Sequence, residues 1–481
     1  MKDKIALLLL GIFVICFSSC LGNDDESTYI PSGDAQVYYF HLQNDSIPAL
    51  DSVKFTIDQL NGKIYNPDSM PYGTVIKEKV VCTFTTRGVA GIQVKQTALA
   101  DTLSWWNTTD SLDFTRPVEF VVTPMDGIHK KPYTAWINIH TVNPDSMAWR
   151  RLAEGIYPPV ESADLYNKPV VMMSPDSTEY WMFATAIESG RNTYSLYKAP
   201  LSGPADWRLE TDHIAFPYDA SLGESAPVVR LDQMVWWNDT LIVPQQSGMA
   251  QTQLYKSANG KDWEKVPLAD TPFIQTILGV VGMPGRDNYL CTVALTPSGQ
   301  LAFCRTPDLT TWEFEESEMP SGFPAGGNFA SLSYQNMYHP YLLLVGGRES
   351  QNGALLNTVW NTSDGLNWIK YESVLPPFDQ PREGAMLTPY DGKFYLIGGT
   401  DAAGQTTRSI VYSTDRGLSW KPVDDLKVFP ADYNARSFAS VHVDKENNLL
   451  LFGGRESASS AWLDEVWSGK INRLGFAEPG N

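Results

Sequence analysis

Hydrophobic runs that end in a pair of glycines recur through the last third of the chain. Three runs share this ending: Leu342–Val345, Phe394–Ile397 and Leu449–Phe452. Thirteen residues after the second glycine of each pair stands an aromatic side chain: Trp360, Tyr412 and Trp467. A strand-like unit that repeats about every 50 residues is typical of a β-propeller, in which each repeat supplies one four-stranded blade. The pattern therefore predicts a propeller in this part of the chain.

Tryptophans divide the region before the last repeat into units of similar length. They stand 49 to 56 residues apart: Trp207, Trp263, Trp312, Trp368 and Trp420. A turn rich in small and polar residues precedes each one, and Ser413–Trp420 fits the pattern S-x-D-x-G-x-x-W in full. In such a turn we expect the acidic side chain to cap backbone amides, the glycine to take a positive φ and the tryptophan to pack between blades. These turns are therefore predicted to be structural.

The sixth unit has its glycine pair and Trp467 but no closing tryptophan. The segment Trp149–Leu152, which lies before the first unit, matches Trp420–Val423 in residue type. We therefore expect residues near 147–152 to pair with the last blade, because this pairing removes open sheet edges that would otherwise aggregate. The prediction is a six-bladed β-propeller over residues 147–475.

Residues 34–143 lack the repeat but are rich in short strand-like segments. These segments alternate in polarity or are rich in β-branched and aromatic residues: 53–57, 80–84, 118–122 and 133–140. Turn clusters such as Asn61-Gly62 and Asp126-Gly127 separate them. Short strands at this spacing favour an immunoglobulin-like β-sandwich. The expected fold class is therefore all-β, with a sandwich before the propeller and Asn143–Ser146 as the linker.

The first 20 residues have the composition of an export signal. Two lysines precede an apolar stretch that is too short to span a membrane comfortably. Residues 17–20, Phe-Ser-Ser-Cys, resemble a lipobox, although Phe stands where Leu is usual, a departure that the lipoboxes of Bacteroidetes tolerate. The resemblance implies acylation of Cys20, and the acidic tether at residues 21–33 looks like the signal that sends such lipoproteins to the outer face of the outer membrane. The alternative is an ordinary secretory signal with a chance cysteine.

Charge and cysteine content exclude some classes of partner and of covalent framework. The chain carries 55 acidic and 36 basic side chains, a formal net charge of −19, which disfavours nucleic acid as a partner. Beyond the signal and lipobox, Cys82, Cys291 and Cys304 remain, an odd number that predicts no disulfide framework. Cys291 and Cys304 flank a turn and could face each other, but Cys304 stands where other repeats have an aromatic, so we expect it to be a small buried hydrophobe.

The sequence contains no pattern that predicts a metal or a cofactor. The histidines lack metal-ligand spacing: His41, His129, His140, His213, His339 and His442. There is no phosphate-binding loop, no dinucleotide fingerprint and no nucleophile elbow. We therefore expect no metal and no cofactor, and assign no catalytic residue from the sequence.

Together these motifs resemble known groups of proteins. The glycine pairs and their following aromatics resemble kelch repeats, and the S-x-D-x-G-x-x-W turns resemble the Asp boxes of sialidase-type propellers. The layout of the whole chain looks like that of uncharacterised Bacteroidetes surface lipoproteins, which have an immunoglobulin-like N-terminal domain and a kelch-like propeller. These motifs specify a fold and not an activity.

Charged residues stand just after the glycine pairs and just before the first strands of the last three units. In a four-stranded meander these positions emerge on one face, so we expect them to form a rim around the centre. The candidate ligand-binding residues are Arg348, Glu349, Arg382, Glu383, Asp401, Arg436, Arg455 and Glu456. Guanidinium groups bind carboxylates through paired hydrogen bonds, which would suit an anionic sugar or another carboxylate ligand. The alternative is that Arg and Glu pair between neighbouring blades and stitch the ring together.

Two functions would use this rim, and a structural or adhesin role is the third alternative. The first is a non-catalytic surface module that binds a glycan or a partner protein and assists outer-membrane nutrient uptake. The second is a sugar-active enzyme that resembles the kelch-like sialic-acid epimerases or a glycosidase, with Glu349, Glu383 and Glu456 as candidate carboxylates. Several tryptophans could stack on sugar rings or pack inside the protein: Trp181, Trp236, Trp237 and Trp462.

Overall fold

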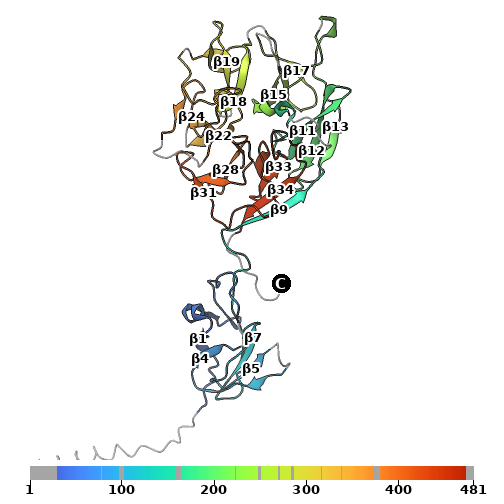
Figure 1. Cartoon of the computed structure of the whole chain (residues 1–481). Helices are drawn as coiled ribbons and strands as arrows, with labels where there is room; N and C mark the ends of the chain where they lie inside the picture. The colour runs from blue at the N-terminus through green and yellow to red at the C-terminus, as the bar shows by residue number, and fades with distance from the viewer. Residues whose placement is uncertain are drawn as a thin grey trace, which may run out of the picture. The chain divides into compact units, whose positions relative to one another are not determined.

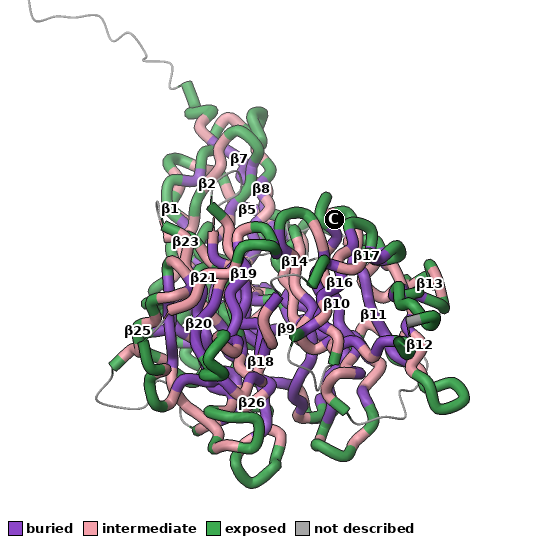
Figure 2. Tube along the Cα trace, turned by 90° about the horizontal axis from the view of Figure 1, so that it is seen from above, coloured by how far each residue is buried: buried purple, intermediate pink, exposed green. Residues whose placement is uncertain are grey.

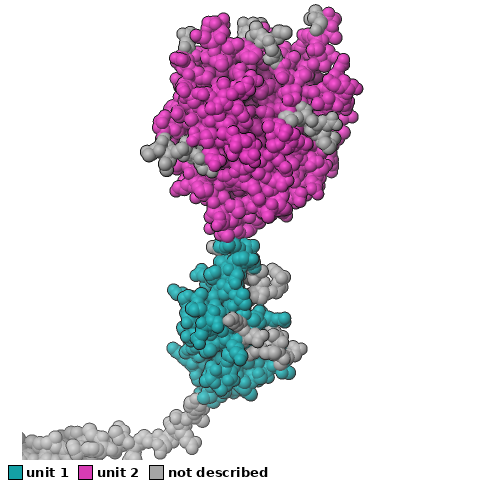
Figure 3. All heavy atoms as spheres, in the orientation of Figure 1, with its two compact units in different colours: residues 1–144, 473–481 teal, residues 145–472 magenta. Residues whose placement is uncertain are grey.

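The chain forms two compact units, which are described separately (Figure 3). The boundary lies between Pro144 and Asp145, and the second unit extends to Asn472. The computed structural model describes residues 30–76, 79–96, 102–157, 164–222, 224–246, 251–268, 271–282, 287–315, 317–336, 339–372 and 380–472. The predicted export signal, Cys20 and most of the acidic tether lie outside these residues.

Two sheets of the first unit enclose a hydrophobic core. The larger has the order β2 (Thr56–Asp58), β3 (Lys63–Tyr65), β8 (Lys131–Trp136), β7 (Val118–Pro124), β5 (Val89–Gln96) and β6 (Ser104–Trp105). The smaller pairs β1 (Val37–Gln43) with β4 (Val81–Thr86), and the short 3-10 helix η2 (Pro48–Ser52) follows β1. Phe40 of β1 packs edge-on against Phe84 of β4 and Phe120 of β7, with ring centroids 5.3 and 6.4 Å apart. The core therefore lies between the two sheets.

The larger sheet is mixed, because β3 and β8 pair in parallel with Ile64 opposite Ala135. Its other strand pairs are antiparallel. The first unit is thus all-β, and the immunoglobulin-like sandwich stays a prediction.

The second unit consists of four-stranded antiparallel sheets arranged around a centre (Figure 1). The described residues form six of them, numbered in chain order. Sheet 1 contains β10 (Val170–Met173), β11 (Glu179–Glu188), β12 (Arg191–Pro200) and β13 (Arg208–Thr211); sheet 2 contains β14 (Val235–Trp237), β15 (Thr240–Pro244), β16 (Leu254–Ser257) and β17 (Glu264–Lys265); sheet 3 contains β18 (Ile274–Gly282), β19 (Asn288–Leu295), β20 (Leu301–Thr306) and β21 (Glu313–Phe314).

Sheets 4 to 6 hold the repeats that the glycine pairs mark. Sheet 4 contains β22 (Ala330–Asn336), β23 (His339–Val345), β24 (Val359–Thr362) and β25 (Ile369–Lys370); sheet 5 contains β27 (Met386–Tyr390), β28 (Lys393–Ile397), β30 (Ile410–Ser413) and β31 (Lys421–Pro422); sheet 6 contains β32 (Ser440–Val443), β33 (Leu449–Phe452), β34 (Val466–Ile471) and β9 (Met147–Ala153). The short strands β26 (Arg382–Glu383) and β29 (Thr400–Asp401) pair next to sheet 5, and three 3-10 helices lie between strands: η3 (Leu165–Asn167), η4 (Ala220–Leu222) and η5 (Leu231–Gln233).

The hydrophobic runs before the glycine pairs are second strands with both faces covered. All four residues of β33 are buried, as are the last four of β23. Similar buried stretches can be followed along β18 and β20 in Figure 2. A strand covered on both faces needs apolar side chains at consecutive positions rather than in alternation. The second glycine of each pair has a φ between 92° and 101°, a region that disfavours side chains, so the chain can turn sharply at the strand end.

The pairing predicted for residues 147–152 is present. β9 lies antiparallel to β34, with Met147 opposite Ile471 and Arg151 opposite Trp467. A shared core joins sheet 6 to sheet 1: Val171, Tyr180, Met182, Phe438, Leu450 and Phe452. A strand from the start of the second unit thus completes the sheet formed at its end.

The polar turns before the tryptophans are held by the side chains that the sequence pattern indicates. Asp415 Oδ1 accepts from the backbone N–H of Ser419 at 2.9 Å, Gly417 has a φ of 95°, and Trp420 Nε1 donates to the carbonyl of Gly417 at 3.1 Å. Asp364 caps Leu366 and Asn367 in the same way in sheet 4. These turns therefore fix the link between the third and fourth strands.

The described cysteines are buried free thiols: Cys82, Cys291 and Cys304. Cys291 lies opposite Arg305 and Cys304 opposite Thr292, so the two thiols are offset on the β19–β20 hairpin. Burial raises the pKa of both Cys291 and Cys304 to about 12, which keeps them protonated and unreactive. This agrees with the expectation that Cys304 acts as a small hydrophobe.

Acidification should weaken the contact between sheets 1 and 6 at His442. Its Nε2–H donates to the carbonyl of Val171 at 2.8 Å, and burial lowers the pKa of this histidine from its ordinary 6.5. Because the unfolded chain takes up the proton first, His442 contributes its full stabilisation above about pH 6.5 and loses it as pH falls toward the folded-state pKa. Urea unfolding between about pH 8 and pH 5 should therefore show a smaller loss of stability in His442→Gln than in the wild type.

The exposed His213 gives the matched control for this measurement. A His213→Gln variant should follow the wild-type pH profile. Identical profiles for His442→Gln and the wild type would contradict the assignment.

Candidate ligand-binding site at the centre of the sheets

A cavity lies where the first strands of the sheets begin. It has a volume of about 170 Å³ and is called the inner cavity below. Its lining comes from the starts of sheets 1 to 6: Lys168, Arg230, Asp232–Val235, Thr276–Gly279, Gly327–Phe329, Ser331, Gly384, Ala385, Phe438 and Ala439. The inner cavity is therefore common to all six sheets.

A second cavity of about 420 Å³, here the loop cavity, lies among the loops that lead into the first strands and out of the second strands. Arg230, Gln233 and Asn328 line both cavities, so the two adjoin. The side chains of the loop cavity are mostly polar, with amides in the majority: Asp164, Tyr166, Arg230, Gln233, Gln245, Gln246, Thr252, Gln275, Asn328 and Gln351. Its size is that of a small-ligand pocket, but such pockets are usually mostly apolar.

Several amides of the loop cavity are available to a ligand. Gln233 is used by the protein, because its Oε1 accepts from the backbone N–H of Ile277 at 3.2 Å. Among the described residues, the side chains of Gln246, Gln275 and Gln351 have no hydrogen-bond partner. Each amide offers two donors and an acceptor, which is the combination that a hydroxyl group requires. The loop cavity thus suits a ligand with several hydroxyl groups.

Charged side chains that line the inner cavity are partly compensated. Arg230 donates from Nε and Nη2 to the two carboxylate oxygens of Asp232, at 3.2 and 2.6 Å. Lys168 follows η3, and within the described part of the chain its ammonium has neither a hydrogen bond nor an ion pair. Burial lowers the pKa of Lys168, while the charge of Asp232 opposes this effect.

Two of the residues predicted from the sequence form an ion pair between neighbouring sheets. Arg348, after β23 of sheet 4, donates from Nε and Nη2 to the two carboxylate oxygens of Glu383 in β26, both at 2.6 Å. Asn328 Nδ2 donates to Glu383 Oε2 at 2.7 Å, and the bidentate contact raises the pKa of Arg348. The carboxylate of Glu383 is thus already occupied by protein donors.

Arg382 and Arg436 are buried, at 2% and 0% exposed, and they repeat one arrangement in successive sheets. Nη1 of Arg382 donates to the carbonyl of Gly398 at 3.0 Å, and Nη1 of Arg436 donates to the carbonyl of Gly453 at 3.1 Å. Their own carbonyls accept from the glycine pair of the preceding sheet, Gly347 and Gly399, at 2.9 and 3.0 Å. Each arginine therefore connects its sheet to the one before it.

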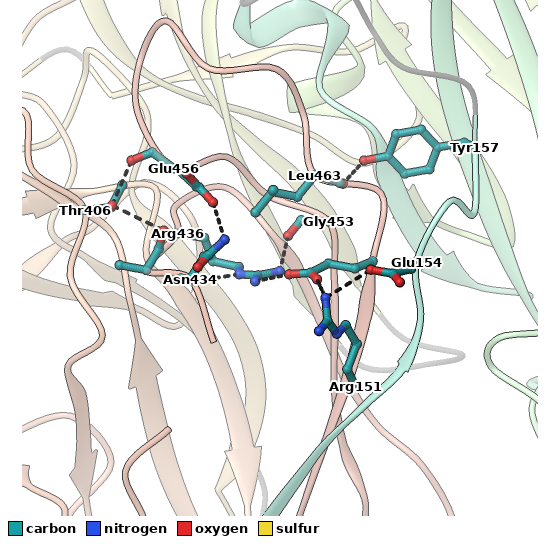
Figure 4. A network of polar contacts seen from close by, with 11 residues as sticks. Arg151, Glu154, Tyr157, Thr406, Asn434, Arg436, Gly453, Glu456 and Leu463 are labelled. Atoms are coloured by element: carbon teal, nitrogen blue, oxygen red, sulfur yellow. Dashed lines mark hydrogen bonds and ion pairs between the residues drawn. The ribbon is translucent and has the colours of Figure 1, made fainter. Parts of the chain in front are cut away.

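A charged network surrounds Arg436 (Figure 4). Arg436 Nη2 donates to Glu465 Oε1, and Arg151 Nη1 of β9 lies 3.5 Å from Glu465 Oε2. Arg151 also contacts Glu154 at 3.0 Å. Glu465 therefore lies between an arginine that precedes the first strand of sheet 6 and one on the strand that completes this sheet.

The remaining predicted residues differ in exposure. Arg455 is 6% exposed, its guanidinium lies 5.0 Å from the ring centroids of both Phe438 and Trp462, and burial lowers its pKa. Glu349 and Glu456 are exposed, and the carboxylate of each accepts one hydrogen bond, from Gly322 N–H and Asn434 Nδ2 respectively. Asp401 caps the turn after β29 through Ala403 and Gln405.

The predicted rim is therefore not one continuous exposed surface. Arg382, Arg436 and Arg455 point into the protein, which favours the stitching alternative for them. Most of the aromatics proposed as sugar platforms are also buried: Trp181, Trp237 and Trp462. For these three tryptophans the stacking alternative was wrong, because neighbouring sheets cover their rings.

Most of the residues that line the two central cavities were missed from the sequence. Lys168, Arg230 and Gln275 come from sheets 1 to 3, where no glycine pair marks the strand end. A weak signal was present, because each stands just before or at the start of the first strand of its unit, as Asn328 does in sheet 4.

The residues that the structure describes contain no group of three His, Cys, Asp or Glu side chains arranged to hold a metal ion. Nor do they include a helix with the length and apolar character that a membrane crossing requires.

Four-stranded sheets around a central cavity define the class of the second unit as a β-propeller. The chain belongs to the DUF6242 family. The family model described as the DUF6242 beta propeller domain matches residues 143–479. A second family model, described as the N-terminal domain of DUF6242, a domain of unknown function, matches residues 32–137.

Solved structures similar to the chain include one titled "Structure of YjhT". It is 13% identical, the match covers 67% of this chain and 100% of that chain, and the TM-score is 0.43. No curated protein sequence matches the chain.

Proposed function

We propose that this protein is a surface lipoprotein whose propeller binds a glycan in the loop cavity. In this proposal the six sheets are the blades of one closed kelch-like ring with Asp-box turns, and the first unit is an immunoglobulin-like spacer. Cys20 carries the lipid anchor, and the protein faces the cell exterior as an accessory of nutrient uptake at the outer membrane.

The polar lining of the loop cavity is the observation that carries the proposal. A cavity of about 420 Å³ lined by glutamine, asparagine and tyrosine side chains is better matched to a polyhydroxylated ligand than to an apolar one. Gln246, Gln275 and Gln351 come from different loops, so their amides approach a ligand from several sides. Sugar hydroxyls, which both donate and accept, fit such a lining.

The sequence of the N-terminus supports the proposed location. The lipobox-like residues 17–20 are followed by an acidic segment. One acyl chain binds a membrane only marginally, and several chains on one cysteine anchor a protein stably.

The alternative of a sugar-active enzyme has less support. Glu383 is bound by Arg348 and Asn328, so it has little freedom to exchange protons with a substrate. Glu349 and Glu456 are exposed and do not line either central cavity. Catalysis therefore stays an untested prediction.

Replacing Gln275 by Ala should weaken glycan binding about threefold to tenfold, because one hydrogen-bonding side chain contributes about 0.5–1.5 kcal/mol. The measurement is a glycan-array screen with the full-length protein in detergent, followed by calorimetric titration of the glycans that bind. Gln405→Ala is the matched control, because Gln405 is exposed on a loop of sheet 5 and lines neither central cavity.

Absence of binding by the folded wild type would contradict the glycan proposal and direct attention to a protein partner. Equal binding by wild type and Gln275→Ala would exclude the loop cavity as the site.

A further inference from the structure

Lys168 lines the inner cavity and forms no ion pair with a described carboxylate, although the charge of Asp232 acts on it from a distance. It follows the 3-10 helix η3, and its backbone N–H closes the last turn by donating to the carbonyl of Leu165 at 3.0 Å. This places its side chain in the lining of the inner cavity, beside Arg230 and Asp232. No described residue forms an ion pair or hydrogen bond with its ammonium group.

Other charged groups form ion pairs with one another, and Lys168 is in none of these pairs. Asp232 is committed to Arg230 through both carboxylate oxygens, and Glu383 is committed to Arg348 in the same manner. The exposed Asp164 lines the loop cavity and not the inner one.

An ammonium group that has lost part of its water without forming an ion pair is energetically costly. Burial indeed lowers the pKa of Lys168. An anion bound beside it would remove this cost. The free energy gained would then contribute to ligand affinity.

Resting on the proposed glycan-binding function, we propose that the ligand is an acidic sugar whose carboxylate is received by Lys168 and Arg230. Arg230 lines both cavities and is held in place by Asp232, so it can contact a ligand that enters through the loop cavity. The hydroxyl groups of the same sugar then lie against the amides of Gln275 and Gln246. The carboxylate extends toward Lys168.

A carboxylate fits this site better than a phosphate. One uncompensated lysine balances a single negative charge, whereas a phosphate monoester carries about 1.5 to 2 charges at neutral pH. The neighbouring arginines already have their own carboxylate partners. The site is therefore matched to a hexuronic acid or a similar monoanionic sugar.

The test compares matched ligands with the full-length protein in detergent. Hexuronic acids, their neutral hexoses and the corresponding hexose 6-phosphates are titrated by calorimetry. We expect the acid to bind at least about tenfold more tightly than its neutral counterpart, because charge-assisted hydrogen bonds are about twice as strong as neutral ones.

Variants at position 168 test the assigned residue. Lys168→Met should weaken binding of the acid by roughly ten- to hundredfold and leave the neutral sugar unchanged, while Lys168→Arg should retain most of the preference. Lys421→Met makes the same chemical change on the exposed strand β31 and should alter neither affinity. Thermal unfolding of each variant shows that the protein remains folded.

Each other outcome has one meaning. Equal binding of acidic and neutral sugars, unaffected by Lys168→Met, would overturn the carboxylate assignment and leave the glycan-binding function intact. Preference for the phosphate would overturn it as well. A folded wild type that binds none of these ligands, and no glycan on the array, would overturn both proposals.

Discussion

Replacing Arg436 by Ala should lower the free energy of unfolding of the second unit by about 3–5 kcal/mol, the cost of breaking a buried ion pair from one side. Arg436 is fully buried. Its guanidinium donates hydrogen bonds to Glu465 and to the carbonyls of Gly453 and Asn434. Its removal leaves the Glu465 carboxylate, among the described residues, with the partly exposed Arg151 alone, at 3.5 Å. Urea unfolding followed by tryptophan fluorescence measures the change.

The exposed Arg208 on β13 provides the matched control for this substitution. Arg208→Ala removes the same atoms and should change stability by no more than about 0.5 kcal/mol. A loss for Arg436→Ala as small as that of the control would show that the network in Figure 4 contributes little. The arginine would then be available for another role.

The burial of Arg382 and Arg436 differs from the exposed rim that the sequence suggests. In the sequence, Arg382 and Arg436 precede first strands at a position that faces the centre, and their charge suggests exposure. In the structure each guanidinium turns under the glycine pair of its own sheet and reaches a carbonyl, of Gly398 or Gly453. A residue pattern records the position of a side chain along the strand but not its rotamer. Burial of these arginines could not be read from it.

Features that depend on local chemistry could be predicted. The glycine pairs mark strand ends because glycine tolerates the φ needed there, and Asp415 caps its turn because the amide that it caps is only four residues away. The pairing of β9 with β34 was also predicted, although about 320 residues separate the strands. The last unit has no closing tryptophan, and this indicated that its fourth strand comes from elsewhere in the chain.

The two central cavities depend on contacts between segments that share no local signal. Lys168, Arg230, Gln275 and Asn328 come from four sheets. From the sequence alone, each of them could equally be a solvated polar residue in a loop. These residues differ from other polar loop residues only because they line the same two adjoining cavities. That proximity depends on how the sheets are arranged and cannot be read from the sequence.

Replacing Gly398 by Ala should destabilise the second unit by about 3 kcal/mol, the sum of a left-handed backbone and a steric clash. Gly398 has a φ of 63°, and a Cβ there would lie 2.5 Å from the carbonyl oxygen of Arg436. That carbonyl belongs to the preceding segment of sheet 6 and accepts a hydrogen bond from Gly399 at 3.0 Å. The new methyl group would therefore force sheets 5 and 6 apart, and urea unfolding would detect the loss.

Gly404 is the control that separates the cost of the backbone conformation from the cost of the steric clash. It lies in the loop between β29 and β30 and has a similar φ of 75°, but no atom lies within 4 Å of an added Cβ. Gly404→Ala should therefore cost only the backbone term, about 1–2 kcal/mol. The excess loss in Gly398→Ala measures the close approach of the Arg436 carbonyl. Equal losses in the two variants would mean that the sheets can separate at no cost, and that glycine is needed at position 398 for its φ alone.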